Sequence, residues 1–377
     1  MVRDFAPLYD VNASYEDNYE HGPFGAFGEA LEHEGDGVAA PSADGQSNED
    51  RFQSFLGNMV REPFGIPAGP LLNERFATAA FRMGFDLAVY KTVRSRQWGC
   101  NPFPNVLSVH PKNKSGFLVP GNAELDEGVL ADTHYESPVS ISNSFGVPSR
   151  DPDVWQPDMH KAIGQAGRGQ LLIPSFQGSR TPEMDTQAYI ADHVLTAKLV
   201  AETGASLMEM NTSCPNEGHN RLLCHDPRLV GEITDAVKRE IGDLPLIIKL
   251  AYIPTDEALE SMLRNTVARG SVQGIAAINT ISAKLVDAQG GQALPGEGRE
   301  RSGVCGNAIR QAGLDMVRRL AALRERMDLN FAIIGVGGVL SAQDYVSYRQ
   351  SGADAVMSAT GAMWNARLAQ EIHALKQ

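Results

Sequence analysis

The segment Leu207–Asn216 combines a thiol with two carboxamides over a few residues. Its apolar beginning is typical of a buried strand, and its polar end carries Asn211, Cys214 and Asn216. Carboxamides both donate and accept hydrogen bonds, so they could hold a polar heterocycle beside a thiol that exchanges a proton. The same residues could instead form an ordinary turn around a buried cysteine. Considered alone, the segment supports both interpretations.

More amides stand at the ends of other apolar runs. Asn143 follows one such run, and Asn279 and Thr280 end another. Each could merely shape a turn, but together with Asn211 and Asn216 they make four carboxamides at expected strand ends. A planar ring with alternating N–H and C=O groups is their natural complement. A ligand without those groups would leave buried amides unpaired, at about 1–3 kcal/mol each.

Two lysines, Lys91 and Lys249, each end an apolar strand. A cation at that place needs a partner or a ligand, and a salt bridge to a neighbouring carboxylate would satisfy either one. If the ligand is a flavin, an ammonium at Lys249 near the pyrimidine end of the ring would stabilise the negative charge that develops on reduction.

Two glycine-containing turns near the C-terminus are typical of a phosphate site. Gly337 and Gly338 follow the apolar run in Ile333–Val339, and Ser358–Gly361 follows the next expected strand. Glycine lets backbone N–H groups approach an anion closely. Glycine turns after strands are common for steric reasons, but two successive ones favour a phosphorylated ligand.

The elements that must position these residues alternate short apolar runs with longer amphipathic stretches. Strands are expected over Phe64–Ala68, Leu87–Lys91, Leu171–Phe176, Leu207–Met210, Leu246–Leu250, Gly274–Asn279, Phe331–Gly335 and Ala355–Ser358. Helices are expected over Thr186–Thr203, Pro227–Ile241, Thr255–Arg269, Asn307–Arg326 and Ser341–Ser351. This alternation predicts an α/β fold, a closed (β/α)8 TIM barrel, with a doubly wound open sheet as the alternative.

Two long interruptions, Val93–Ser140 and Thr280–Gly303, follow the second and sixth expected strands. Both would lie as long loops at the C-terminal face, where barrel enzymes keep their active sites. Loops of that length usually have a function, although plain surface insertions are the simpler explanation.

Residues 1–55 differ in composition from residues 56–377. The first segment is acidic and rich in glycine and serine, so we expect a partly irregular extension that packs only locally on the barrel domain. Its aromatic residues could anchor it to the domain or to a partner subunit: Tyr9, Tyr15, Tyr19, Phe24 and Phe27.

Composition narrows the classes of partner. With 377 residues and a net charge of -13, the chain is a poor match for nucleic acid or an anionic membrane. No apolar run is long enough to span a bilayer, and the N-terminus does not resemble a signal peptide, so a cytoplasmic location is expected. The four cysteines are scattered and the histidines lack ligand spacing, which predicts no metal site, iron–sulfur cluster or disulfide scaffold.

From about Phe64 to the C-terminus, the order of these motifs resembles class 1, the cysteine type, of the dihydroorotate dehydrogenase family. The resemblance rests on Phe64–Gly69, on Tyr90–Thr92 with Asn101–Pro104, on Asn143–Val147, and on the loop Asn211–Asn216.

This resemblance implies an enzyme containing flavin mononucleotide (FMN) that oxidises (S)-dihydroorotate to orotate in pyrimidine biosynthesis. Cys214 would remove the proton at C5 while hydride leaves C6 for the flavin. Substrate-binding positions would be Lys91, Asn143, Phe145, Gly146, Val147, Asn211, Asn216, Asn279 and Thr280. Cofactor-binding positions would be Ala68, Gly69, Lys91, Asn211, Lys249, Asn279, Gly303, Gly306, Gly337, Gly338, Ala359 and Thr360. Members of this class suggest a homodimer.

The electron acceptor is left open by the resemblance among fumarate, NAD through an iron–sulfur partner protein, and a quinone. Ser302, Cys305 and Ala359 stand where many family members have glycine. The Ser302–Ile309 stretch also resembles the pyrimidine-binding domain of dihydropyrimidine dehydrogenases, which would reduce uracil or thymine with electrons from a partner chain. A third alternative is a non-catalytic barrel that binds a phosphorylated metabolite.

Overall fold

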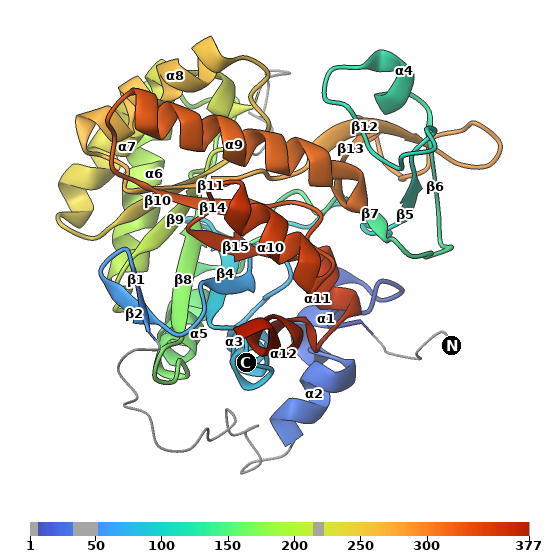
Figure 1. Ribbon diagram of the computed structural model, residues 1–377, viewed down its shortest axis with the longest axis horizontal. Helices are drawn as coiled ribbons and strands as arrows, with labels where there is room; N and C mark the ends of the chain where they lie inside the picture. The colour runs from blue at the N-terminus through green and yellow to red at the C-terminus, as the bar shows by residue number, and fades with distance from the viewer. Residues whose placement is uncertain (1–6, 33–51, 214–221, 377) are drawn as a thin grey trace.

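The computed structural model describes residues 7–32, 52–213 and 222–376 of the chain (Figure 1). Eight parallel strands close into a barrel in the order β10-β11-β14-β15-β3-β4-β8-β9. Their bounds are Phe64–Ile66 (β3), Leu87–Val93 (β4), Leu171–Phe176 (β8), Met208–Asn211 (β9), Leu246–Leu250 (β10), Gly274–Ala277 (β11), Ala332–Val336 (β14) and Ala355–Met357 (β15). The predicted (β/α)8 TIM barrel is therefore confirmed, and the open-sheet alternative is wrong.

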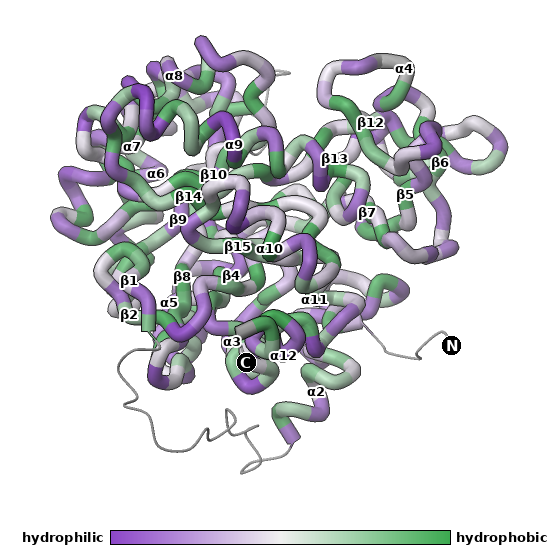
Figure 2. The backbone as a smooth tube through the Cα atoms, in the orientation of Figure 1, coloured by the Kyte–Doolittle hydropathy of each residue, from purple (hydrophilic) through white to green (hydrophobic). Residues whose placement is uncertain are grey.

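Nearly every residue of the barrel strands is buried, because the strands face a packed interior on one side and helices on the other. Hydrophobic residues recur along these strands, for example along β8 in Figure 2. Alternating residues such as Leu87 and Val89 point into the interior cluster, which also contains Ile173 and Ile334. The hairpin of β1 (Gln53–Phe55) and β2 (Asn58–Val60) adds side chains to the same cluster, so it closes the barrel at the N-terminal ends of the strands.

Helices cover the outside of the barrel, and most of the longer ones begin with a side-chain cap. The principal ones are α3 (Glu74–Arg82), α5 (Pro152–Gly164), α6 (Thr186–Ala201), α7 (Pro227–Ile241), α8 (Asp256–Asn265), α9 (Arg310–Arg326) and α10 (Ala342–Gln350), followed by the short α11 (Thr360–Trp364) and α12 (Leu368–His373). Asn73, Asp185, Asp226, Thr255 and Ser341 each accept a hydrogen bond from a first-turn N–H. The five predicted helices are confirmed within a few residues at their ends.

The two long interruptions are folded rather than left as loops. Strands β5 (Ser108–His110), β6 (Val129–Asp132) and β7 (Ser140–Asn143) come from the first, with the short helix α4 (Ala123–Asp126). Strands β12 (Ile281–Val286) and β13 (Arg301–Gly306) come from the second. The five close into a small second barrel beside the main one (Figure 1). Its β7–β13 pairing places Asn143 opposite Gly303.

The described part of the N-terminal extension packs on the barrel. Helices α1 (Tyr15–His21) and α2 (Gly25–Glu32) lie beside α3, α11 and α12 (Figure 1). Tyr9, Tyr15 and Phe27 are buried, and the Leu8 N–H donates to the Met363 carbonyl at 3.1 Å. These aromatic residues therefore anchor the extension to the barrel domain, which is one of the two alternatives predicted from the sequence.

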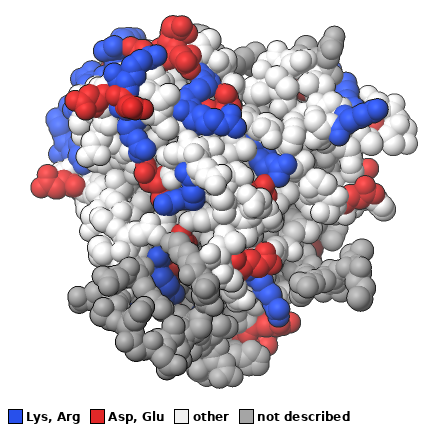
Figure 3. All heavy atoms as spheres, viewed as in Figure 1, with Lys and Arg blue, Asp and Glu red and all other residues white. Residues whose placement is uncertain are grey.

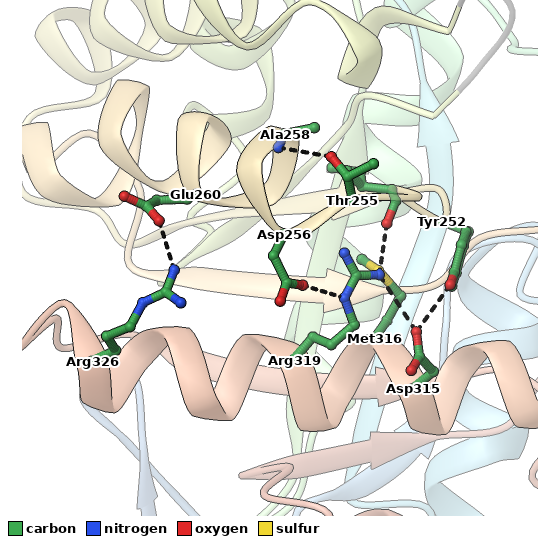
Figure 4. Close-up of polar contacts among 10 residues, drawn as sticks. Tyr252, Thr255, Asp256, Ala258, Glu260, Asp315, Met316, Arg319 and Arg326 are labelled. Atoms are coloured by element: carbon green, nitrogen blue, oxygen red, sulfur yellow. Dashed lines mark hydrogen bonds and ion pairs between the residues drawn. The ribbon is translucent and has the colours of Figure 1, made fainter.

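Charged side chains of both signs alternate over the outer helices α7, α8 and α9 (Figure 3). The contact between α8 and α9 centres on Arg319 (Figure 4). Its Nε donates to Asp256 at 2.6 Å, and its Nη1 donates to the Ile253 carbonyl at 2.8 Å and to Asp315 at 3.4 Å. One half-buried guanidinium thus fixes the start of α8 to the middle of α9.

Replacing Arg319 with leucine should lower the free energy of unfolding by about 1–2 kcal/mol, because a buried carbonyl and two carboxylates lose a donor. Urea unfolding of the purified protein measures this change. Arg228→Leu is the matched control, since Arg228 makes only an exposed ion pair with Glu232 one turn along α7. Equal effects of the two substitutions would contradict the structural role of Arg319.

Candidate functional site

A pocket lies at the C-terminal ends of the barrel strands and is bordered by the small barrel and the N-terminal extension. Fifteen residues selected from the sequence line it: Ala68, Gly69, Lys91, Asn143, Phe145, Val147, Asn211, Lys249, Asn279, Thr280, Gly306, Gly337, Gly338, Ala359 and Thr360. They come from seven of the eight barrel strands or the turns that follow them, and from β7, the segment after it and β13 of the small barrel. Residues distant in sequence thus meet where a barrel fold places its ligands.

The amides are joined in a hydrogen-bonded row. Asn279 Nδ2 donates to Ser213 Oγ at 2.6 Å, and Ser213 Oγ donates to Asn211 Oδ1 at 3.0 Å. Asn211 Nδ2 then donates to Gln177 Oε1 at 2.7 Å. Asn211 is buried, so its rotamer is fixed by these partners and by packing. A row of this kind presents oriented donors and acceptors to a planar polar ring.

Lys249 lies beside a buried acid. Burial lowers the pKa of Lys249, and the negative charge of Glu209 opposes that change. Burial likewise raises the pKa of Glu209, opposed by Lys249 and by a hydrogen bond from Ser175 Oγ at 3.2 Å. The carboxylate neighbour that the sequence left open thus exists for Lys249, and its negative charge favours the charged form of the lysine at the wall of the pocket.

Lys91 has a different environment. Its ammonium lies 3.4 Å from the Pro148 carbonyl and 3.5 Å from that of Thr92. Burial, together with the nearby charge of Arg94, lowers the pKa of Lys91 to about 7. Because the Lys91 amine is desolvated and lies near another cation, an anionic ligand should stabilise its charged form more than that of Lys249.

The glycine turns at the opposite end of the pocket cannot accept side chains. A Cβ on Gly306 would lie 2.4 Å from the Val139 carbonyl, and one on Gly338 would lie 2.5 Å from the Arg310 Cβ. Gly306, Gly337 and Gly338 also have φ values of +84°, +124° and +69°, a region that favours glycine. Tyr348 supports the turn from beneath, because its hydroxyl donates to the Gly337 carbonyl at 2.6 Å. The site therefore has an amide-and-lysine end and a backbone-lined end.

Comparison with known proteins agrees with this arrangement. The family model described as dihydroorotate dehydrogenase matches residues 52–375. A dihydroorotate dehydrogenase of Dictyostelium discoideum is 34% identical over 373 residues, covering 97% of this chain and 96% of the relative. The chain belongs to the dihydroorotate dehydrogenase family. A catalytic subunit of dihydroorotate dehydrogenase B (NAD(+)) from Thermodesulfovibrio yellowstonii is 30% identical over 228 residues, covering 60% of this chain and 68% of the relative.

Four residues selected from the resemblance to dihydroorotate dehydrogenases are not seen in the pocket lining. Cys214 and Asn216 lie outside the described residues. Gly146 and Gly303 lie behind the lining: a Cβ on Gly303 would meet Thr280 Oγ1 at 2.3 Å, and one on Gly146 would meet Asn101 Oδ1 at 2.9 Å. Both glycines are suited to let neighbouring residues approach closely.

The structure also adds residues that motif reasoning did not assign to the site. Glu209 lies inside the segment Leu207–Asn216 and lines the pocket. Its partner could not be identified from the sequence, because that partner lies on the neighbouring strand. Tyr9 and Tyr15 reach the pocket from the extension, where both pack edge-on against Phe145, with ring centroids 5.5 and 6.2 Å away. The sequence showed that these two residues are aromatic and could anchor the extension, but it did not indicate which surface they cover.

In the part of the chain that the structure describes, no group of three or more His, Cys, Asp or Glu side chains is placed to hold a metal ion. Over the same residues, no helix has the length and apolar character needed to cross a membrane.

The pKa of Lys91 has a measurable consequence for stability. Because folding lowers this pKa from 10.5 to about 7, the unfolded chain binds an extra proton between those values, and Lys91 contributes a stability that rises with pH across that range. The slope from one group is at most about 1.4 kcal/mol per pH unit. Lys91→Met should therefore be more stable than wild type near pH 7, with the advantage shrinking toward pH 9.

Urea unfolding of the ligand-free protein at both pH values measures this difference. Lys198→Met, at an exposed position on α6, is the control and should show the same difference from wild type at both pH values. A Lys91→Met effect that does not change with pH would show that the amine is not depressed by burial.

Proposed function

We propose that this chain oxidises (S)-dihydroorotate to orotate in pyrimidine biosynthesis, with FMN as its cofactor. The observation that carries the proposal is the two-ended pocket: oriented amides and lysines at one end, and backbone turns without side chains at the other. It occurs in a chain of the dihydroorotate dehydrogenase family, with a relative of that name over nearly its whole length.

The residues at the backbone-lined end fit the phosphate of FMN. Gly306, Gly337 and Gly338 hold turns that side chains would disrupt, so backbone lines this end of the pocket together with Thr360. Turns of this kind after the seventh and eighth barrel strands are the usual phosphate site of the fold. Ala68 and Ala359 add small side chains to the lining, which suits a planar ring system.

Lys249 would serve the flavin ring at the other end. When bound, FMN supplies a two-electron acceptor for the hydride at C6 of dihydroorotate. The Lys249 ammonium, kept charged by Glu209, would stabilise negative charge near the pyrimidine edge of that ring. Glu209 in turn accepts from Ser175 Oγ, which shares a hydrogen bond with Thr92 Oγ1 at 2.9 Å. This buried chain fixes the position of the carboxylate.

The substrate would be held by the amide row and by Lys91. Asn143, Asn211 and Asn279 can pair with the ring N–H and C=O groups, and Asn216 would complete the set. Lys91 supplies a cation for the anionic substrate. Cys214 would take the proton from C5 as a thiolate, which places this protein in class 1. We further propose that the chain acts as a homodimer in the cytoplasm.

An electron-transfer partner protein is compatible with this assignment. The Thermodesulfovibrio relative is named as the catalytic subunit of an NAD(+) enzyme, so a barrel of this family can be one part of a larger assembly. We propose the acidic residues 1–55 as a separate extension of the barrel domain 56–377. Tyr9 and Tyr15 of this extension form one edge of the pocket.

Anaerobic mixing of the FMN-loaded protein with dihydroorotate should bleach the flavin absorbance, whereas dihydrouracil should leave it unchanged. The amides and Lys91 are complementary to a ring that carries a carboxylate. Stopped-flow absorbance measures both reactions in the same preparation. Bleaching by dihydrouracil alone would replace the assignment with a dihydropyrimidine dehydrogenase activity, and a protein that cannot take up FMN would exclude both.

Cys214→Ser should slow the bleaching by dihydroorotate by a factor of about 10²–10⁴, because serine is a far weaker base than a thiolate at neutral pH. The bound flavin should be retained. Cys224→Ser is the control, since Cys224 is a buried cysteine outside the pocket lining. An unchanged rate in Cys214→Ser would rule the thiol out as the base.

A further inference from the structure

Arg94 lies just beyond the end of β4, behind the pocket wall, and none of the motifs considered above includes it. Its side chain is buried, with the guanidinium carbon 4.3 Å from the centre of the Trp98 ring. Its Nε donates to the Val147 carbonyl at 3.0 Å, and Nη1 donates to Ser179 Oγ at 3.2 Å. Arg94 therefore connects the end of a barrel strand to the segment that carries Phe145 and Val147 into the pocket.

That segment has an unfavourable backbone conformation at the point where Arg94 holds it. Gly146 and Val147 have φ values of +77° and +52°. Glycine adopts this region freely, but for a β-branched residue it is a true outlier, with a typical penalty of about 1–2 kcal/mol. Val147 lines the pocket in this conformation. An unfavourable turn persists only when its surroundings determine it, and the Arg94 donor to the Val147 carbonyl is one such determinant.

Arg94 also reaches Asn211 through one intervening side chain. The Gln177 carboxamide lies 2.7 Å from Asn211 Nδ2. With its oxygen turned the other way, the same carboxamide accepts from Arg94 Nη1 at 3.3 Å and Nη2 at 2.9 Å. The Gln177 oxygen therefore accepts from Asn211 in one orientation and from Arg94 in the other, so both side chains contact the same carboxamide. Arg94 thus contacts residues beside two separate parts of the proposed substrate site: the Val147 turn and, through Gln177, the surroundings of Asn211.

A contribution to general stability alone does not explain an arginine at this position. The charge of Arg94 lies close enough to Lys91 to disfavour the charged form of that buried lysine. A neutral side chain would avoid this repulsion, but it could not supply a rigid fork of N–H donors to the Val147 carbonyl, Ser179 and Gln177.

We propose that Arg94 is a positioning residue of the substrate site: it holds the strained Gly146–Val147 turn against the pocket, and it contacts Gln177, the side chain next to the Asn211 amide. This inference rests on the proposed function, because the ligand it serves is the pyrimidine carboxylate. Arg94 does not line the pocket, so its effect on the ligand passes through the residues it holds.

The test is titration calorimetry of orotate into the FMN-loaded protein. Arg94→Met should weaken orotate binding about tenfold or more, since a charge-assisted hydrogen bond to the turn is lost. Arg94→Lys should fall between Arg94→Met and wild type, because lysine keeps the charge but not the fork. Arg96→Met is the matched control: Arg96 is two residues further on, is half-exposed and pairs with Asp192, so its loss should leave orotate affinity unchanged.

A second substitution separates positioning from general stability. In the Arg94→Met background, Val147→Gly should restore part of the lost affinity, because glycine adopts the left-handed turn without the penalty that Arg94 otherwise offsets. Gln177→Met should weaken binding less in that background than in wild type, since the contact between Arg94 and Gln177 is already lost.

Equal orotate affinity in Arg94→Met and wild type would overturn the inference, as would a loss that Val147→Gly leaves unrelieved. A wild-type protein that binds FMN but not orotate would overturn the proposed function itself, and this inference with it. This outcome can be told apart from a failure of the Arg94 inference alone, because it is measured on the wild-type protein before any variant is made.

Discussion

The hydrogen-bonded register between β8, β9, β10 and β11 is the constraint on which the site depends. In this register Glu209 lies opposite Ile247, and Asn211 lies opposite Lys249. A slip of one residue would turn every side chain to the other face of its strand. The register therefore decides that the acid, the amide and the lysine meet at one mouth, and the buried interior of the barrel fixes the register in turn.

The sequence predicted the features that depend on local patterns, and it missed those that depend on contacts between residues far apart in the chain. The eight barrel strands and five helices follow from local periodicity, and the pocket residues at their ends follow from parallel strand direction. The small barrel was not predicted, because it is closed by two pairings between strands more than a hundred residues apart, such as that of Asn143 with Gly303. Short strands such as Ser108–His110 carry too little pattern to be recognised alone. The contacts of Glu209, Tyr9 and Arg94 likewise depend on partners supplied by other elements.

The two pocket lysines show how burial can give the same residue type different properties. Burial lowers the pKa of Lys249, but the negative charge of the nearby Glu209 opposes that change. Lys91 has a second cation nearby, and its pKa falls to about 7. The two lysines therefore differ in the sign of the charge beside them, and the difference arises from neighbours contributed by separate strands.

The closure of the main barrel has a consequence for the order of events during synthesis. The last strand, β15, pairs with the first, β3, so the ring of strands stays open until nearly the whole chain has left the ribosome. The N-terminal extension emerges first, yet the Leu8 N–H bonds to Met363 near the other end. This contact therefore cannot form until more than three hundred further residues are translated. A truncated nascent chain can neither close the ring nor make this contact, so incomplete products should be readily visible to cellular quality control.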